Sequence, residues 1–551
     1  MTSNASTEYD YIIVGAGSAG CVLANRLSAS GEHRVLLLEA GEDDRWMWIK
    51  IPAGIAHILI GERAIWRFAT EPDEKVGGRS IFWPRGRALG GSSAVNGMIW
   101  VRGDPLELDH WESLGNPGWG SGDILPYLKR MESFAPGDPA YRGHDGPMHI
   151  TRYLDRDPLS QGFIEGAQQA GVPAVEDYNG PRFEGVSYLQ YNTKHGWRRH
   201  TGDNYLRPAM RRANLTVETG ALTQRVLLEG HRAVGLVYRK GGQDVTVKAR
   251  REVLLCAGSV QSPQLLELSG IGNGDVLKRA GVNVAHHLPG VGENLRDHLH
   301  VRLGFETQLN ITLNTILRNP LLKAKMGARW LFLGRGLMST SSATSMAIAR
   351  SSPDLPRPDI KMQLHQLSMA SSHYGGNANA RSFAERMGLD PYPGFSIGCY
   401  CLRPESQGSV HIRSADAAAP PEIHANYLSA EHDIRTIVAA LRMIRKIAAQ
   451  PGLAQHIVRE TRPGPEASSD DALLDHARAT GQTSYHPIGT CRMGTDARAV
   501  VDAKLKVHGI EGLRVCDASI MPTMVASNTN APSIMIGEKA SDLVLADARS
   551  G

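Results

Sequence analysis

The N-terminal stretch DYIIVGAGSAGCVLANRL constrains the fold more than any other part of the chain. Its apolar run at 10–14 ends in Gly15, Gly17 and Gly20, which have the GxGxxG spacing, and a helical periodicity follows. A second buried-strand pattern, HRVLLLEAG, places Glu39 near its end. This order of strand, helix and strand, with an acidic residue closing the second strand, predicts a βαβ unit that binds a dinucleotide.

Each part of this motif has a physical role toward a pyrophosphate. Gly15 permits the tight turn, Gly17 lets the backbone approach the phosphates, and Gly20 lets the helix pack closely on the strand. The helix N-terminus presents free N–H groups to the anion, and Glu39 can accept hydrogen bonds from the adenosine ribose. The motif alone does not distinguish NAD from FAD. The predicted contacts are Gly15, Gly17, Ser18, Ala19, Gly20, Glu39 and Ala40.

The other strand candidates lie far apart in the sequence. LTVETG near 215, EVLLCAG near 252 and GLRVCDAS near 512 are each followed by small residues, as at the ligand-binding edge of a parallel sheet. The segments between them differ in character, and one carries a helical apolar period over 431–450. A chain of 551 residues with 42% hydrophobic side chains can form two cores.

We therefore predict an α/β fold (α+β overall) with two domains. The predicted dinucleotide-binding domain combines residues 1–156, 198–307 and 484–551, and the predicted second domain combines 157–197 and 308–483.

The composition excludes several partners. A net charge of +4 from 60 basic and 56 acidic residues provides no field that favours nucleic acid. We interpret the short basic run at 194–200 as a solvated surface. The six cysteines form no CxxC pair and no zinc-like spacing, so reduced, mostly buried thiols and no metal site are expected.

The N-terminus and the hydropathy indicate where the protein resides. The first residues contain no basic region followed by a long apolar stretch, so a secretory signal is not expected. No window is apolar and uncharged over the ~18 residues that a spanning helix needs. We expect a cytoplasmic protein without a transmembrane segment, and peripheral contact with the inner membrane stays open.

Two long motifs resemble those of a known family. GRALGGSSAVNGMIWVRG (86–103) and GSVQSPQLLELSGIG (258–272) resemble the two signatures of the glucose–methanol–choline (GMC) oxidoreductases. VGENLRDHL, YHPIGTCRMG and NTNAPSIMIGEKASDL follow in the family's order, so the resemblance spans nearly the whole chain. It implies FAD as the cofactor, a Rossmann-like FAD-binding domain assembled from separated segments, and a substrate domain with an antiparallel sheet flanked by helices.

The resemblance also implies further flavin contacts. Some family members attach FAD to a histidine just before the asparagine of the first signature, but this chain has Val95 there, so we predict non-covalent FAD. The implied cofactor-binding positions are Gly90, Gly91, Ser92, Asn96, Gly97, Val226, Tyr485, Asp517, Ala518, Asn530 and Pro532.

His486, in the segment TSYHPIGTC, and Asn530 fall on the positions that the family uses for its catalytic pair. Oxidation of an alcohol removes a hydroxyl proton and a hydride from the same carbon, so a base is required. Neutral imidazole, with an unperturbed pKa of about 6.5, can take that proton, and the Asn530 amide can bond the substrate oxygen. The resemblance predicts FAD-dependent oxidation of a primary alcohol to an aldehyde, of the choline or aliphatic-alcohol dehydrogenase type.

Other functions exist on this scaffold, because a fold does not fix a function. The alternatives are a hydroxynitrile lyase-like lyase, a decarboxylase and a non-catalytic flavin-binding protein. The pair of His486 and Asn530 argues against the second and third, whereas lyase relatives keep a histidine. The expected partners are a small-molecule alcohol and an electron acceptor, either oxygen or a quinone-type carrier, between which the sequence does not decide.

Overall fold

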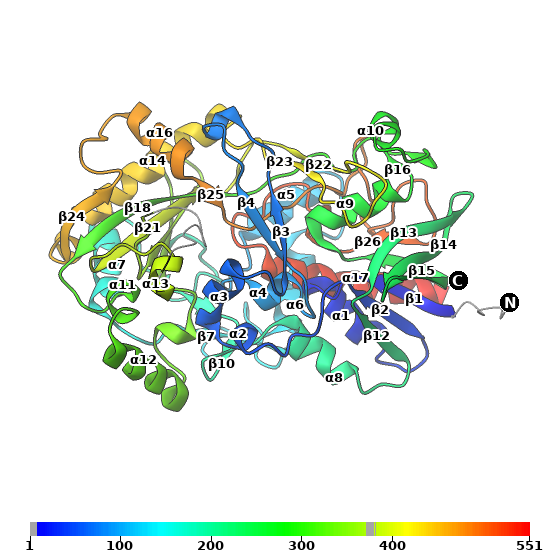
Figure 1. Cartoon of the computed structure of the whole chain (residues 1–551), viewed down its shortest axis with the longest axis horizontal. Coiled ribbons are helices and arrows are strands. Elements are labelled where there is room, and N and C mark those ends of the chain that lie inside the picture. Colours follow the sequence, from blue (N-terminus) through cyan, green and yellow to red (C-terminus); the bar gives the residue numbers. More distant parts are fainter. Residues whose placement is uncertain (1–7, 371–379, 381, 551) are drawn as a thin grey trace.

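The structure, a computed structural model, describes residues 8–370, 380 and 382–550. These residues form two lobes that lie side by side along the long axis of the molecule (Figure 1). Each lobe is built on a seven-stranded sheet. We call the lobe on the right of Figure 1, which contains the N-terminal strand, the first lobe, and the other the second lobe.

The first lobe contains the predicted βαβ unit and joins strands from distant parts of the chain. Its strand order is β12-β2-β1-β15-β14-β13, and β26 pairs with β15. The strands around β1 are parallel, whereas β13, β14 and the first half of β15 are antiparallel. Their bounds are β1 Glu8–Val14, β2 Val35–Glu39, β12 Leu215–Thr219, β13 Leu222–Glu229, β14 Arg232–Lys240, β15 Gln243–Leu255 and β26 Leu513–Val515.

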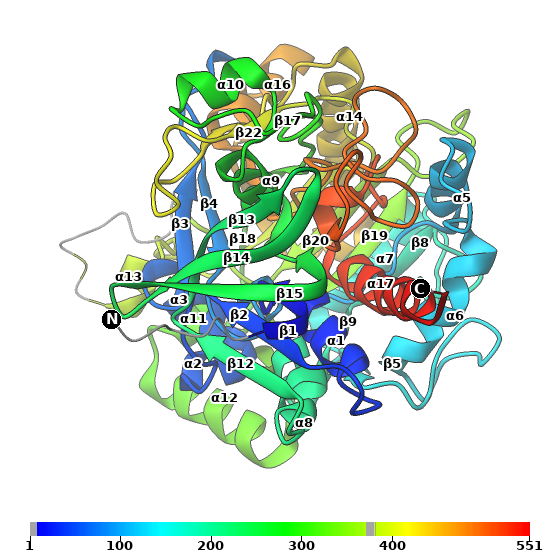
Figure 2. The ribbon, with the colours of Figure 1, turned by 90° about the vertical axis from the view of Figure 1, so that its right-hand side faces the viewer.

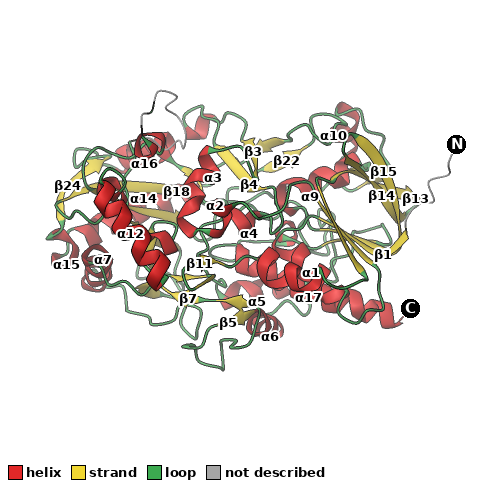
Figure 3. Ribbon diagram, turned by 60° about the horizontal axis from the view of Figure 1, so that its bottom comes forward, coloured by secondary structure: helices red, strands yellow, loops and turns green. Residues whose placement is uncertain are grey.

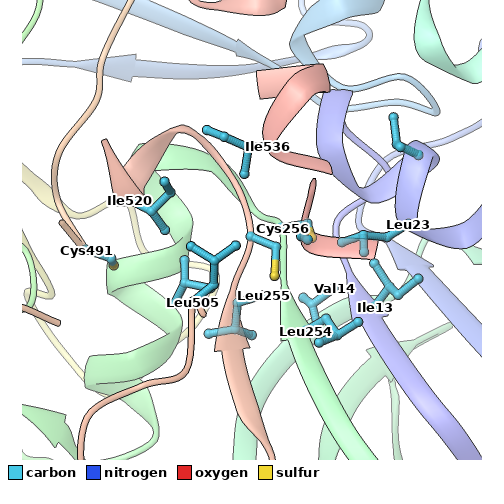
Figure 4. Close-up of a cluster of buried hydrophobic side chains, with 14 of the residues drawn as sticks. Ile13, Val14, Leu23, Leu254, Leu255, Cys256, Cys491, Leu505, Ile520 and Ile536 are labelled. Carbon is cyan, nitrogen blue, oxygen red and sulfur yellow. The ribbon is translucent and has the colours of Figure 1, made fainter. Parts of the chain in front are cut away.

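Apolar runs explain why these strands associate. The strands β1 and β15 are parallel neighbours, and Ile13 and Val14 lie opposite Leu254 and Leu255. Figure 4 shows these side chains gathered with Leu23 and with residues from near the C-terminus. Leu23 belongs to α1 (Ser18–Leu27), which packs against α17 (Asn530–Ser550). The two ends of the chain therefore build one core.

The second lobe is built on an antiparallel sheet, as the resemblance implies. Its order is β24-β18-β21-β20-β19-β8, and β25 pairs with β18. Helices lie against this sheet (Figure 3). The bounds are β8 Gly185–Tyr188, β18 Leu299–Thr307, β19 Ala343–Ala349, β20 Ile360–His365, β21 Gly394–Cys401, β24 Ile457–Arg462, β25 Gln482–Thr483, α7 Pro158–Gln169, α14 Glu431–Ala448 and α16 Asp470–Thr480.

The course of the chain differs from the predicted division at two places. The strand β18 lies within 198–307, which we assigned to the dinucleotide-binding domain, yet it pairs with β21 and β24 in the second sheet. The hairpin of β22 (Ser409–His411) and β23 (Glu422–His424) lies within 308–483 but contacts α9 (Gly258–Leu268), where His411 bonds Glu267 at 2.7 Å. The composition of the sequence did not reveal that these two segments join the other lobe, because each segment is short.

The interpretation of 194–200 as a solvated surface is wrong for its central members. Arg198 is buried, and its guanidinium donates to the carbonyls of Ile49 at 2.8 Å and Asn96 at 2.7 Å. His200 is also buried, with Nε2 3.0 Å from Asp44. The basic side chains of this run therefore bind backbone carbonyls and carboxylates inside the first lobe.

Two other predictions, the helix over 431–450 and the buried thiols, are confirmed. The apolar period over 431–450 forms α14, whose inward face is buried. All six cysteines are free and buried. Within the described ranges, no helix is both long and apolar enough to cross a bilayer.

Candidate active site

A cavity of about 760 Å³ lies between the two lobes. The first lobe contributes Gly17 and Glu39 to its wall, and the second lobe contributes His300 and Gln363. The segment 483–487 lines the same space. The dinucleotide motif and His486 therefore face one cavity, although more than 400 residues of sequence separate them.

Most of the predicted cofactor-binding residues line this cavity. Those on its wall are Gly15, Gly17, Ser18, Ala19, Glu39, Ala40, Gly91, Ser92, Asn96, Gly97, Tyr485, Asp517, Ala518 and Asn530. Four predicted positions are not on the wall: Gly20, Gly90, Val226 and Pro532. The sequence reasoning missed the neighbouring wall at 221–223 and 257–261.

The four residues away from the wall have structural reasons for their identity. A Cβ on Gly20 would lie 1.9 Å from the Gly15 carbonyl oxygen, so this glycine permits close packing of helix on turn. A Cβ on Gly90 would lie 2.4 Å from the ring of His200. The backbone N–H of Val226 is occupied by Ser269 Oγ at 2.8 Å, so it is not free for an adenine. Pro532 lies in the first turn of α17.

Glu39 is buried at the dinucleotide end of the cavity. Its Oε2 accepts from the Ala16 N–H at 3.0 Å and its Oε1 accepts from the Gly41 N–H at 2.8 Å. Burial raises the pKa of this carboxyl to about 7 although both hydrogen bonds favour the charged form. Each carboxylate oxygen can accept two hydrogen bonds, so Glu39 keeps acceptor capacity for a ribose hydroxyl.

His486 is held from its backbone by one buried carboxylate. Oδ1 of Asp297 accepts from the His486 N–H at 2.8 Å, and Oδ2 accepts from Thr483 Oγ1 at 2.6 Å and from the Tyr427 hydroxyl. The bonds to the 483–486 segment fix the short stretch that carries the imidazole. Asp297 comes from VGENLRDHL, so two of the quoted motifs meet here.

The hydrogen bonds of His486 determine its tautomer. Nε2 of His298 contacts the Leu402 carbonyl at 3.1 Å, so that nitrogen carries the proton and Nδ1 of His298 is an acceptor. The Nδ1 atoms of His298 and His486 are 3.0 Å apart, so His486 donates from Nδ1. The acceptor lone pair of His486 is therefore on Nε2.

The amide that meets this lone pair belongs to Asn528. Its Nδ2 donates to His486 Nε2 at 2.9 Å. Its Oδ1 accepts from the buried ammonium of Lys361, on β20, at 2.6 Å. Because an ammonium can only donate, Lys361 orients the amide with its nitrogen toward His486. Burial lowers the pKa of Lys361 to about 7.

The structure does not pair Asn530 with His486 as predicted. Asn530 is the first residue of α17, and its Oδ1 accepts from Ser18 Oγ at 2.9 Å. Its Nδ2 is buried without a partner among the described residues. The predicted pair is therefore corrected to His486 and Asn528, because the start of the helix turns the Asn530 side chain toward α1. Pro532, close behind, was the sequence signal for that helix start.

The surroundings of His486 keep it neutral. Burial lowers its pKa well below 6.5, and the nearby His298, Lys361 and Arg85 lower it further. An unprotonated Nε2 thus faces the cavity near neutral pH. This arrangement can accept a proton from a ligand hydroxyl.

Comparison with known proteins identifies the family. Residues 9–300 match the first domain model of GMC oxidoreductases, and residues 404–537 match the second. The chain belongs to the GMC oxidoreductase family. It is 44% identical over 544 residues to an oxygen-dependent choline dehydrogenase of Photobacterium profundum, covering 98% of this chain and 93% of the relative. It is 42% identical over 552 residues to the mitochondrial choline dehydrogenase of Homo sapiens, covering 98% and 90%.

A solved structure has the same fold. Pyridoxine 4-oxidase from "Mesorbium loti" superposes with a TM-score of 0.86 at 31% identity, covering 97% of this chain and 98% of that one. This GMC oxidoreductase is accordingly an FAD-dependent enzyme that oxidises an alcohol. The comparisons lend no support to the lyase alternative.

The cavity fits FAD. A Cβ on Gly91 would lie 2.6 Å from Gly17 Cα, so the two glycine-rich loops approach each other as a bound dinucleotide requires. The unpartnered Asn530 Nδ2 and the remaining acceptor capacity of Glu39 offer polar contacts along the same wall. These residues, with Ser92 and the backbone near Asp517, would hold the cofactor.

The residue before Asn96 allows a direct test of how the flavin is attached. Val95 lines the cavity and has no nucleophilic nitrogen, so we expect precipitation of the yellow enzyme with acid to release the flavin into the supernatant. Absorbance of the supernatant measures the released fraction. Yellow colour that stays with the washed, denatured pellet would contradict non-covalent binding.

Proposed function

We propose that this enzyme oxidises a primary alcohol to an aldehyde with His486 as the base. The observation that carries the proposal is the unprotonated Nε2 of His486, held in the cavity beside the Asn528 amide. FAD, when bound, supplies the acceptor for the hydride that leaves the alcohol carbon. The roles of this chain are to bind the alcohol, to remove its hydroxyl proton and to stabilise the oxygen that loses it.

The geometry supports a definite division of roles. In the structure the Asn528 amide donates to the Nε2 lone pair of His486, so the alcohol hydroxyl must take its place there. The displaced Asn528 Nδ2 can then donate to the alcohol oxygen as negative charge develops. His486 keeps a proton on Nδ1 and donates it in a hydrogen bond to His298 Nδ1. This bond fixes the ring while Nε2 takes the substrate proton. Lys361 and His298 are positioning residues, because they act through Asn528 and His486.

Substitution of the pair tests the proposal. His486→Ala should keep the yellow cofactor but lose about 10²- to 10⁴-fold in kcat/KM for its alcohol, because the proton has no acceptor. Asn528→Ala should lose about 10²- to 10³-fold. The rate at which alcohol bleaches the flavin absorbance without oxygen measures the chemical step directly.

Two further variants make this test specific. His424→Ala changes an exposed histidine outside the cavity and should match the wild type. Asn530→Ala should weaken flavin retention more than the rate per bound flavin, because Asn530 lies on the cofactor wall away from His486. Near-normal bleaching by His486→Ala would remove the histidine from its proposed role.

The low pKa of His486 has a consequence for the pH profile. The base works only when unprotonated, so kcat/KM falls as pH drops through its pKa. Because burial and the neighbouring cations hold this pKa well below 6.5, activity should persist to more acidic pH than a solvent-exposed imidazole would allow. A profile of kcat/KM between about pH 5 and 9 should place the acidic limb below 6.5; a limb at or above 6.5 would contradict the assignment.

We propose that the electrons pass to a quinone-type carrier rather than to oxygen, and that the cytoplasmic enzyme contacts the membrane peripherally. The support is α12 (Pro320–Leu333), at the lower edge of Figures 1 and 2, where Leu321 and Phe332 are 76% and 80% exposed. The segment 313–335 has no acidic residue, and its basic residues are Arg318, Lys323, Lys325, Arg329 and Arg335. An exposed apolar helix with basic residues suits an anionic lipid surface.

Sedimentation with lipid vesicles tests this surface. The enzyme should sediment with vesicles of phosphatidylcholine and phosphatidylglycerol more than with phosphatidylcholine alone, and Phe332→Ser should reduce the bound fraction. Val458→Ser, which removes a 57% exposed side chain on β24, is the matched control. Equal sedimentation of wild type and Phe332→Ser would exclude α12 as the contact.

Faster reoxidation of the reduced flavin by oxygen than by a soluble quinone would exclude the proposed acceptor.

A further inference from the structure

The part of the cavity formed by the second sheet carries an unusual set of polar groups. His300 and Arg302 alternate along β18 and therefore point to the same side of the sheet, and His298 immediately precedes the strand. His298 contacts His486, whereas His300 and Arg302 line the cavity further along the strand. Gln363 and His365, on β20, line the same region, and the rings of His300 and His365 are 5.7 Å apart.

Arg302 has no carboxylate partner among the described residues. Within the part of the chain that the structure describes, its Nη1 contacts the Met369 sulfur at 3.9 Å and its buried Nε has no acceptor. By contrast, the nearby Arg462 pairs with Asp390, and Arg142 pairs with Glu132. Residues 371–379 and 381, which lie outside the description, include no aspartate or glutamate in the sequence.

The carboxylates on the cavity wall lie at its other end. Among the described residues they are Glu39 and Asp517. Glu39 accepts from backbone N–H groups of the dinucleotide turn, and Asp517 accepts from the Gly258 N–H at 2.8 Å and from Ser262 Oγ at 2.5 Å. Neither faces the region of Arg302, so the positive charge there is uncompensated.

The two histidines beside Arg302 do not neutralise it. Burial and the charge of Arg302 hold the pKa of both His300 and His365 well below 6.5, so both rings are neutral and the charge resides on the guanidinium. His300 Nε2, His365 Nε2 and Gln363 Oε1 are buried and have no hydrogen-bond partner in the described ranges of the chain. Buried polar atoms of this kind are normally satisfied by a ligand or by water.

We propose that the substrate is an alcohol that carries a carboxylate at the end remote from its hydroxyl, and that Arg302 binds this carboxylate. The inference rests on the proposed function, because it assumes that the hydroxyl lies at His486. A guanidinium offers a planar pair of donors that matches a carboxylate, and the partly buried setting strengthens the pair. A trimethylammonium group such as that of choline would meet a like charge and no counter-ion.

The geometry also sets the approximate length of the substrate. Arg302, on β18, follows His298 by four residues, which is about 13 Å at the usual rise of extended backbone. Apolar side chains on the same cavity wall, including Leu313, Leu337 and Leu367, suit a methylene chain between the two polar ends. An ω-hydroxy carboxylate of medium length meets both requirements.

Three alcohols that differ only at one end test the proposal on the purified yellow holoenzyme. They are ω-hydroxyoctanoate, n-octanol and (ω-hydroxyoctyl)trimethylammonium, compared by kcat/KM and by anaerobic flavin bleaching. We expect ω-hydroxyoctanoate to exceed n-octanol and the ammonium compound to be the poorest. A preference for n-octanol or for the ammonium compound would overturn the inference. Failure of all three, and of other primary alcohols, to bleach the flavin would instead overturn the proposed function.

Substitution of Arg302 provides the specific control. Arg302→Gln should lower kcat/KM for ω-hydroxyoctanoate by about 30-fold or more, because a desolvated charge pair is lost, and should leave n-octanol within about 3-fold, since an alcohol with no charged end forms no such pair. Arg442→Gln, at an exposed arginine of α14, should leave both substrates unchanged. An equal loss for both substrates in Arg302→Gln would show a structural role and overturn the inference.

A binding measurement keeps the test independent of turnover. Octanoate has no hydroxyl to oxidise, so its affinity for the holoenzyme, measured by calorimetry, reports the carboxylate site alone. We expect binding to the wild type, about 30-fold weaker binding to Arg302→Gln and partial recovery in Arg302→Lys. Equal affinity for wild type and Arg302→Gln would exclude Arg302 as the carboxylate-binding residue.

Discussion

The site depends on one buried carboxylate, Asp297. It accepts hydrogen bonds from the His486 backbone, from Thr483 and from Tyr427, and thereby ties the VGENLRDHL segment to the strand end that carries the imidazole. Burial raises the pKa of Asp297, whereas its three hydrogen bonds and the nearby charge of Arg85 favour its ionised form. A buried carboxylate is stable only when its lone pairs are satisfied, so this anchor specifies the positions of all its partners.

From this anchor, each hydrogen bond along the site determines the next. The Leu402 carbonyl fixes the proton of His298, His298 fixes that of His486, and Lys361 fixes the direction of the Asn528 amide. The Nε2 lone pair of His486 is thus positioned by the Leu402 carbonyl, which acts through His298, and by the Lys361 ammonium, which acts through Asn528. Such preorganisation keeps a base in the orientation that proton transfer requires.

The charges at the two ends of the cavity differ, and this difference bears on the kind of substrate that the site binds. The dinucleotide end holds Glu39 and Asp517, both satisfied by backbone or hydroxyl donors, whereas the second sheet presents an uncompensated guanidinium at Arg302. This charge sets the requirement that the far wall of the cavity places on the ligand.

The sequence by itself determined the βαβ unit, the position of Glu39 at a strand end and the helix α14, because each depends on local periodicity or on residues close together in the chain. It pointed to His486 through the resemblance of its motif to the family's. Tertiary structure decided the rest. Asn528 and Asn530 are two positions apart in the sequence, and the start of α17 gives their side chains different directions. Asn528 points toward His486 and Asn530 toward Ser18. Likewise, strand pairings between segments far apart in sequence join β18 to the second sheet, bring Arg302 to the cavity and bring Lys361 to Asn528. No local pattern encodes such contacts.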